Sequence, residues 1–254
     1  MLLAMDIGNT NIKTGIFKDG KLLNSWRMTT DLHRTSDEYG VQMESFFGHL
    51  GIPKENVTGI ILSSVVPSIN YTIEHMCQLY FNQQPMMVNS SLELELDIWY
   101  DYPELLGADR ICNAVAAHHT YGGPVIIIDF GTATTFSVVS HEGAFIGGAI
   151  GPGIIVSTDA LVEKAAMLHK VEYVKPEHAI CTNTKDGIQS GIINGFVGFV
   201  ENIVRQMEKE LSGKPTVIAT GGMSSMIAAE TDCIDVLHPT LTLEGLNLIY
   251  RMNK

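Results

Sequence analysis

Apolar and polar positions alternate in blocks along the first part of the chain. Residues 2–17 form two apolar strands around a short polar turn, and residues 21–29 add a third strand. A helix is predicted to begin with Ser36 as its N-cap, since acidic residues fill the turn that follows. An apolar strand over 57–65 and a helix over 67–81 complete this first block.

The second part of the chain repeats the same order. Residues 125–139 again form two apolar strands around a polar turn, and residues 143–151 take the place of the third strand. Pro152 is predicted to open a helix, a long helix covers roughly 184–212, and a buried strand lies at 215–220. Each block therefore contains three strands, a helix, a strand and a helix.

The two hairpin turns carry the same Asp-x-Gly pattern. Asp6 aligns with Asp129 and Gly8 with Gly131 at an offset of 123 residues, close to half the chain. A repeated motif at half-chain spacing indicates an internal duplication. The fold class is therefore α/β, with two similar halves joined near 115–124.

These halves are residues 1–115 and 116–254, each expected to hold a mixed sheet covered by helices on both faces. The 254-residue chain is 45% hydrophobic and 17% charged, which allows a sizeable core in each half.

Charge and cysteine content exclude several classes of function. The formal net charge is −12 and no basic block occurs, so no nucleic-acid partner is expected. The four cysteines are widely spaced and form no C-x-x-C, which argues against zinc and disulfide frameworks. The first apolar run is short and contains Asp6, so neither a signal peptide nor a membrane span is expected and the protein is predicted to be cytoplasmic.

The hairpin turns are suited to gripping phosphate. A glycine lets backbone N–H groups approach an anion closely, and Thr10 and Thr132 add hydroxyl donors. The two aspartates would repel phosphate directly, so holding cations beside it is their natural role. Lys13 is either a further phosphate contact or an ordinary solvated strand residue, and Asp6 could instead simply cap a β-turn. No Walker P-loop and no strand-linked G-x-G-x-x-G is present.

A third candidate site lies where a helix is predicted to begin near Gly107. Arg110 offers a planar fork for the carboxylate or amide of a small acid, and Asp109 could accept a proton from an attacking alcohol. Alternatively, Asp109 only complements the helix dipole, and Arg110 pairs with Glu104 or Asp101.

The long helix carries a stripe of glycines. Gly187, Gly191 and Gly195 recur every four residues and therefore share one face. Each glycine costs a helix roughly 1 kcal/mol relative to alanine, so a close helix–helix approach is the expected compensation. Packing within the chain and packing against a second subunit both explain the stripe.

Five motifs together resemble the type III pantothenate kinases, a family within the actin, Hsp70 and sugar-kinase superfamily. They occur over nearly the full length: DIGNTNIK (6–13), YDYPELLGADR (100–110), DFGTATTF (129–136), GPG (151–153) and ATGGM (219–223). Gly-Ala-Asp-Arg (107–110) is the most family-specific. Leu105-Leu106 and Tyr102 depart from the residues expected at those positions.

The resemblance implies two actin-like (ribonuclease H-like) halves with a nucleotide cleft between them. It implies transfer of the γ-phosphate of ATP to the terminal hydroxyl of pantothenate, giving 4'-phosphopantothenate in the first step of coenzyme A synthesis. It makes Asp109 the general base and Asp129 the ligand of a monovalent cation (K⁺ or NH₄⁺), beside Mg²⁺ carried with ATP. It also implies a homodimer.

The resemblance assigns two sets of binding residues. The nucleotide phosphates would contact Asp6, Ile7, Gly8, Asn9, Thr10, Asn11, Ile12, Lys13 and Thr132, with Thr220-Gly221-Gly222 at the adenosine end. Pantothenate would contact Tyr100, Gly107, Ala108, Asp109, Arg110 and Thr184. Two rival interpretations are a sugar or acetate kinase or phosphatase of the same superfamily, and a non-catalytic regulator with the same fold. The first should lack the Gly-Ala-Asp-Arg helix start, and the second has no reason to keep all three aspartates.

Overall fold

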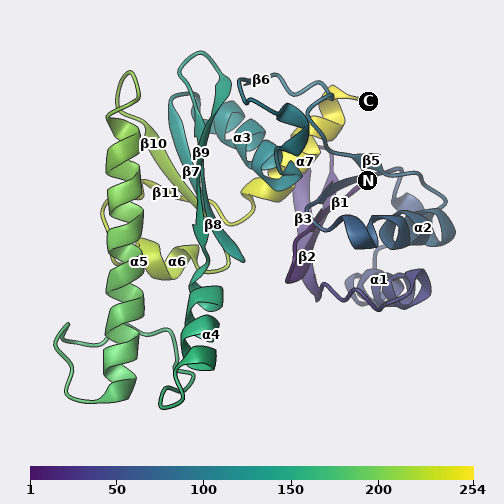
Figure 1. The fold of residues 1–254 in the computed structure, drawn as a ribbon. Coiled ribbons are helices and arrows are strands. Elements are labelled where there is room, and N and C mark those ends of the chain that lie inside the picture. Colours follow the sequence, from purple (N-terminus) through teal and green to yellow (C-terminus); the bar gives the residue numbers. More distant parts are fainter. The chain divides into compact units, whose positions relative to one another are not determined.

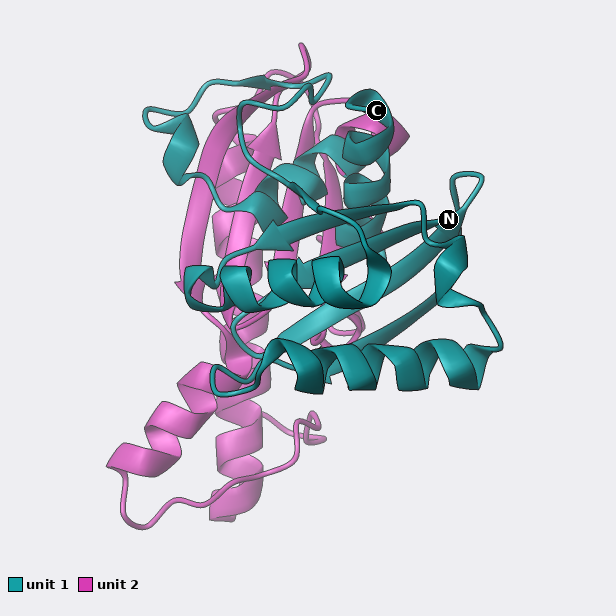
Figure 2. Cartoon of the chain, turned by 90° about the vertical axis from the view of Figure 1, so that its right-hand side faces the viewer, with its two compact units in different colours: residues 1–116, 240–254 teal, residues 117–239 magenta.

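The computed structural model describes residues 1–254 and divides them into two units (Figure 2). Unit 1 comprises residues 1–116 and 240–254, and unit 2 comprises residues 117–239. The division at 116 lies next to the predicted one at 115. The last segment of the chain, which the sequence placed with the second half, belongs instead to unit 1. None of the helices combines the length and apolarity of a membrane span.

Unit 1 is built on a five-stranded mixed sheet of order β3-β2-β1-β4-β5 (Figure 1). β1–β2 and β2–β3 are antiparallel, whereas β1–β4 and β4–β5 are parallel. The strands of this sheet are β1 (Leu2–Ile7), β2 (Asn11–Lys18), β3 (Lys21–Thr29), β4 (Gly59–Ser64) and β5 (Met86–Met87), and the short β6 (Asp97–Ile98) is not part of it. The helices are α1 (Ser36–Leu50), α2 (Asn70–Phe81), α3 (Ala108–Tyr121) and α7 (Leu241–Met252), with 3₁₀ turns at Lys54–Asn56, Pro67–Ile69 and Pro103–Leu105.

Helices cover both faces of this sheet, as predicted. Alternate residues of a strand point to opposite faces, so Met5 of β1 packs with Tyr39 and Met43 of α1 in one buried cluster. On the other face, a Cβ at Gly15 would lie 3.2 Å from Leu243 of α7. The second face, which α7 covers, is the one that carries Asp6.

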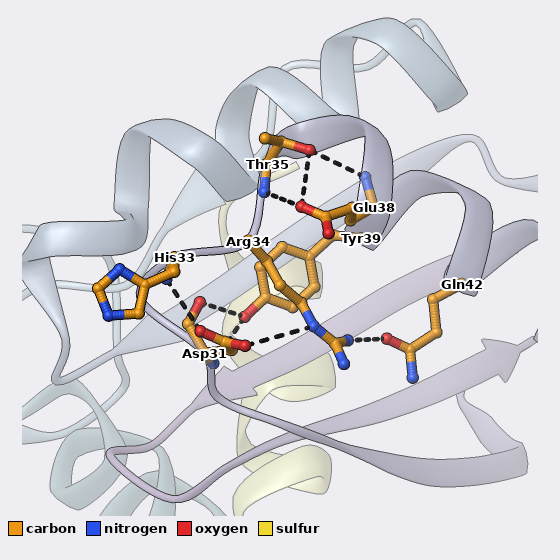
Figure 3. A network of polar contacts seen from close by, with 7 residues as sticks. All are labelled: Asp31, His33, Arg34, Thr35, Glu38, Tyr39 and Gln42. Atoms are coloured by element: carbon orange, nitrogen blue, oxygen red, sulfur yellow. Dashed lines mark hydrogen bonds and ion pairs between the residues drawn. The ribbon is translucent and has the colours of Figure 1, made fainter.

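The start of α1 differs from the prediction by one residue. Thr35, not Ser36, is the N-cap, and its hydroxyl accepts from the Glu38 N–H at 3.3 Å while the Thr35 N–H donates to Glu38 at 2.8 Å. This capping box satisfies two backbone donors reciprocally, which a serine one position later could not do. Figure 3 shows the box beside Asp31, whose backbone exchanges hydrogen bonds with the Tyr39 hydroxyl.

Unit 2 repeats the plan of unit 1. Its sheet has the order β11-β10-β7-β8-β9, with β7–β8 and β8–β9 antiparallel and β10–β7 and β10–β11 parallel. The strands are β7 (Val125–Phe130), β8 (Ala133–Val139), β9 (Ala144–Pro152), β10 (Thr216–Gly221) and β11 (Val236–Leu237). The helices are α4 (Ile154–Lys164), α5 (Thr184–Glu208) and α6 (Ser224–Ala228). The shared strand order supports the duplication indicated by the hairpins.

One helix boundary in unit 2 was predicted wrongly. Pro152 does not open a helix: it is the last residue of β9, paired with Ala133, and α4 begins at Ile154 after Gly153. A proline is tolerated at the end of a strand as well as in the first turn of a helix, so the residue type alone did not decide between them.

Candidate functional site

The first hairpin places Asp6 at the carboxyl-terminal part of β1. Its side chain is buried, and Lys13 is its cross-strand partner on β2, with the ammonium 3.6 Å from Oδ2 of the carboxylate. The turn is closed by a hydrogen bond of 3.1 Å from the Gly8 N–H to the carbonyl of Asn11. Lys13 is therefore part of a polar pair at this turn and not merely a solvated strand residue.

The second hairpin is one residue shorter than the first. Residues 8–11 connect the paired positions Ile7 and Ile12, whereas residues 131–133 connect Phe130 and Thr134. As a consequence, Asp129 has Thr135 as its cross-strand partner, in the place that Lys13 takes opposite Asp6. Only the first hairpin carries a cation opposite its aspartate, so the two turns are not chemically equivalent.

Two glycine motifs close around the second hairpin within unit 2. The Gly153 N–H donates to the carbonyl of Thr132 at 3.0 Å, and a Cβ at Gly153 would lie 2.4 Å from the carbonyl oxygens of Gly131 and Thr132. Gly221 also leaves no room for a side chain, because a Cβ there would lie 2.5 Å from Oδ1 of Asp129. The GPG and ATGGM motifs therefore lie directly beside DFGT.

Helix α3 presents the third candidate group in its first turn. The backbone N–H of Arg110 donates to Oδ1 of Asp109 at 2.8 Å, and Arg110 itself is buried. Gly107 allows this arrangement, because a Cβ there would lie 2.6 Å from the same Oδ1. The carboxylate is thus held at the N-terminal end of the helix, where the dipole favours its charged form.

Asp6 and Asp109 converge on a buried thiol of the same helix. Burial raises the pKa of Cys112 well above its ordinary value, and the negative charges of Asp6 and Asp109 raise it further, while a hydrogen bond with Ser63 acts in the opposite direction. The contacts of Gly107 agree, because a Cβ there would lie 2.6 Å from Oδ1 of Asp109 and 3.7 Å from Val65, whose N–H donates to the carbonyl of Ile7 at 3.1 Å. Unit 1 therefore brings the candidate base and the aspartate of the first phosphate hairpin into one neighbourhood.

Thr184 lies in unit 2, whereas Tyr100, Gly107, Ala108 and Arg110 lie in unit 1. Thr184 is the first residue of α5, capped by Asn183, whose side chain accepts from the Asp186 N–H at 3.0 Å.

Thr184 also lines an apolar groove between α4 and α5, with a volume of about 710 Å³. The three stripe glycines line the same groove, and a Cβ added at any of them would meet no atom within 4 Å. Close packing within the chain, one of the two explanations offered by the sequence, is therefore not found at the stripe.

Comparison with known proteins agrees with this geometry. The sequence profile of the family described as type III pantothenate kinase matches residues 2–206. The chain belongs to the type III pantothenate kinase family. A type III pantothenate kinase of Brevibacillus brevis is 49% identical over 254 residues, which cover 100% of both chains.

More distant solved structures share the fold of this family member. A putative Baf family transcriptional activator from Campylobacter jejuni aligns with a TM-score of 0.60 at 19% identity, over 99% of this chain and 98% of its own. A putative 2-dehydro-3-deoxygalactonokinase from Sinorhizobium meliloti aligns with a TM-score of 0.62 at 11% identity, over 99% and 96%. At such low identity these two matches establish the fold only.

Sequence reasoning did not find Ser63, nor the partners of Gly153 and Gly221. Ser63 contacts Asp6 only because β1 and β4 are paired, and the close approaches of Gly153 and Gly221 depend on the packing of unit 2. The GPG and ATGGM motifs were visible as patterns, but their partners were not. Ser63 carried no signal beyond a polar residue near the end of an apolar strand.

Proposed function

We infer that this protein phosphorylates pantothenate with ATP and acts in coenzyme A biosynthesis. The family membership and the full-length relative support this inference. The structural observation that carries it is the position of Asp109 in the first turn of α3, beside the end of the strand that carries Asp6, because a kinase needs a base beside the phosphate-holding turn. The acceptor hydroxyl is the terminal one, which gives 4'-phosphopantothenate.

Asp109 acts as the general base in this proposal. Its carboxylate accepts the proton of the acceptor hydroxyl as the oxygen attacks the γ-phosphorus, and the leaving group is ADP. The buried guanidinium of Arg110 binds the acceptor through paired N–H donors, because a planar fork matches a carboxylate. The remaining acceptor contacts that we propose are Tyr100, Gly107, Ala108 and Thr184.

The first hairpin and Thr132 hold the nucleotide phosphates. The exposed turn residues 9–11 and the Lys13 ammonium supply donors and positive potential where the triphosphate charge lies. Thr30 holds this loop in place through two hydrogen bonds. Its hydroxyl donates to the Gly8 carbonyl at 2.6 Å, and its N–H donates to the Thr10 carbonyl at 3.0 Å. A preorganised turn loses little entropy when phosphate binds.

Asp129 is the proposed ligand for a monovalent cation, K⁺ or NH₄⁺. The surroundings fit a hard cation, since the Asp129 carboxylate and the Phe130 carbonyl both lie beside Gly221. In addition, Oγ1 of Thr220, the parallel-strand neighbour of Asp129, is buried without a hydrogen-bond partner. Such a cation would neutralise phosphate charge beside the turn. Mg²⁺ arrives with ATP, since no group of three or more His, Cys, Asp or Glu side chains forms a metal cage.

We also propose a cytoplasmic homodimer whose interface includes the open face of α5. Three unpacked helix glycines beside an apolar groove are costly in a monomer. A second subunit that packs against the stripe would recover this cost, because small residues let helices approach closely.

A substrate panel tests the proposed function. The purified protein is incubated with ATP, Mg²⁺ and K⁺ together with pantothenate, acetate, glucose, N-acetylglucosamine or no acceptor, and ADP release is measured. We expect turnover with pantothenate alone, and a product one phosphate heavier by mass spectrometry. Turnover with a sugar or acetate, or with none of the acceptors, would refute the proposal. A second panel of phosphate donors at saturating pantothenate then identifies the preferred donor.

A further inference from the structure

Ser63 lies directly beside Asp6 in the sheet of unit 1. The two residues are register partners in the parallel pair β1–β4, so their side chains point to the same face. Ser63 is fully buried, and its hydroxyl donates a hydrogen bond of 3.1 Å to Oδ1 of Asp6. The strand β4 thus places one small donor against the aspartate.

The two oxygens of Asp6 have different neighbours on the two flanking strands. Oδ1 accepts from Ser63 on β4, and Oδ2 lies 3.6 Å from the ammonium of Lys13 on β2. The two flanking strands therefore contribute one side chain each to hold this carboxylate. Because Lys13 is partly exposed and its stem is flexible, Ser63 is the more rigid of the two contacts.

We propose that Ser63 is a positioning residue for nucleotide binding. Its hydroxyl fixes the Asp6 carboxylate in one orientation, so that the first hairpin presents a single geometry to the phosphates of ATP. The proposal rests on the assignment of Asp6 to the nucleotide site.

Other features of this face agree with that role. A carboxylate that is only 6% exposed loses most of its hydration and needs charge-assisted hydrogen bonds in return. The buried residues of α7 that cover the face carry no charge, and the nearby Asp109 has the same sign as Asp6. Ser63 therefore supplies Asp6 with a buried donor, in addition to the partly exposed ammonium of Lys13.

Two variants of Ser63 test the proposal, with nucleotide affinity as the readout. In Ser63→Ala, the Kd of the non-hydrolysable β,γ-imido analogue of ATP and the KM for ATP should each rise about tenfold, the effect of losing a hydrogen bond to a charged group. The KM for pantothenate should stay within about twofold. Ser63→Thr keeps the hydroxyl and should restore the affinity. A purely structural role would lower the melting temperature and the active fraction but leave both KM values unchanged.

Ser64→Ala is the matched control. Ser64 is the next residue of β4 and points to the other face, where its hydroxyl bonds Asn70 at 2.6 Å and accepts from the Val66 N–H at 3.1 Å. Its loss should lower the melting temperature without changing nucleotide affinity. Normal affinity in Ser63→Ala, or an equal loss in Ser64→Ala, would overturn the proposal.

Asp6→Ala distinguishes a failure of the Ser63 proposal from a failure of the assignment of Asp6 to the nucleotide site. If Asp6→Ala binds the analogue normally, Asp6 is not in the nucleotide site and the assignment fails. If Asp6→Ala binds weakly while Ser63→Ala binds normally, only the positioning role of Ser63 fails. Pantothenate-dependent turnover by the unmodified enzyme tests the overall function independently of both.

Discussion

Gly221 lies so close to Asp129 that no side chain fits between them. A Cβ at Gly221 would be 2.5 Å from Oδ1 of the carboxylate and 2.6 Å from the Phe130 backbone nitrogen and oxygen, and its φ of +95° is a conformation that other residues rarely adopt. The end of β10 is therefore packed against the end of β7 as tightly as two backbones allow. The position of the Asp129 carboxylate depends on this contact.

Gly221→Ala should consequently displace Asp129 or strain the backbone. We expect a loss of stability of about 1–3 kcal/mol and a drop in activity larger than the stability loss explains. Chemical denaturation and steady-state kinetics of the folded fraction measure the two effects. Gly222→Ala is the control, since a Cβ there meets no atom within 4 Å and its φ is ordinary. Equal behaviour of the two variants would contradict the close approach.

Asp109→Asn tests the general base. The amide keeps the size of the side chain and can still accept a hydrogen bond from the Arg110 N–H, but it cannot take up a proton. We expect kcat to fall by about 10²-fold or more, whereas losing a helix-dipole contact would cost only about 0.3–1 kcal/mol of stability. Melting temperature and ATP affinity should change little. A near-normal kcat would leave Asp109 with the dipole role alone.

Replacement of the monovalent cation tests Asp129. Activity should fall sharply when Na⁺ replaces K⁺ and NH₄⁺ at constant ionic strength, because the smaller ion fits the same oxygen donors poorly. In Asp129→Asn the choice of ion should no longer matter, since the amide lacks the negative charge that binds it. Initial rates in the three chloride salts provide the measurement. Full activity of the unmodified enzyme in Na⁺ alone would refute the cation site.

Gly191→Leu tests the proposed dimer interface. The groove has room for the added side chain within one chain, so the variant should fold, yet it should be monomeric or aggregated in sedimentation velocity. Gly48→Leu makes the same change at an equally open and exposed glycine of α1 and should leave the oligomeric state unaltered. An intact Gly191→Leu dimer would place the interface elsewhere.

The Cys77 thiol should make the stability of the fold depend on alkaline pH. Burial raises its pKa to about 12, whereas the unfolded thiol titrates near ~8.5. Above that unfolded pKa the native state binds more protons than the unfolded state, so stability is lost as pH rises towards 12.

This single group contributes about 1.4 kcal/mol per pH unit within the window. Cys77→Ala should therefore show a shallower decline than the unmodified protein when urea unfolding is compared at pH 8 and pH 10. Cys181→Ala, at a half-buried position, is the control. Parallel declines in all three proteins would rule out the Cys77 contribution.

Local patterns in the sequence determined the two hairpins, the duplication and the family. Each hairpin is specified by residues that are adjacent in the sequence: an apolar run, a turn with glycine and a second apolar run. Asp6 and Asp129 could be chosen as candidates for this reason, and Asp109 from the Gly-Ala-Asp-Arg sequence at the predicted start of a helix. The N-cap of α1 was missed by one residue because adjacent Thr35 and Ser36 are both good caps, and only the reciprocal bonds with Glu38 distinguish them.

Only the tertiary structure decided which residues lie beside these aspartates. Ser63 is 57 residues from Asp6 and reaches it through the register of a parallel strand pair, which no local pattern specifies. The contact of Gly221 with Asp129 arises in the same way between β10 and β7. The C-terminal helix α7 joins unit 1 for a similar reason: its apolar face shows that it must be buried, but only the packing shows which sheet it covers.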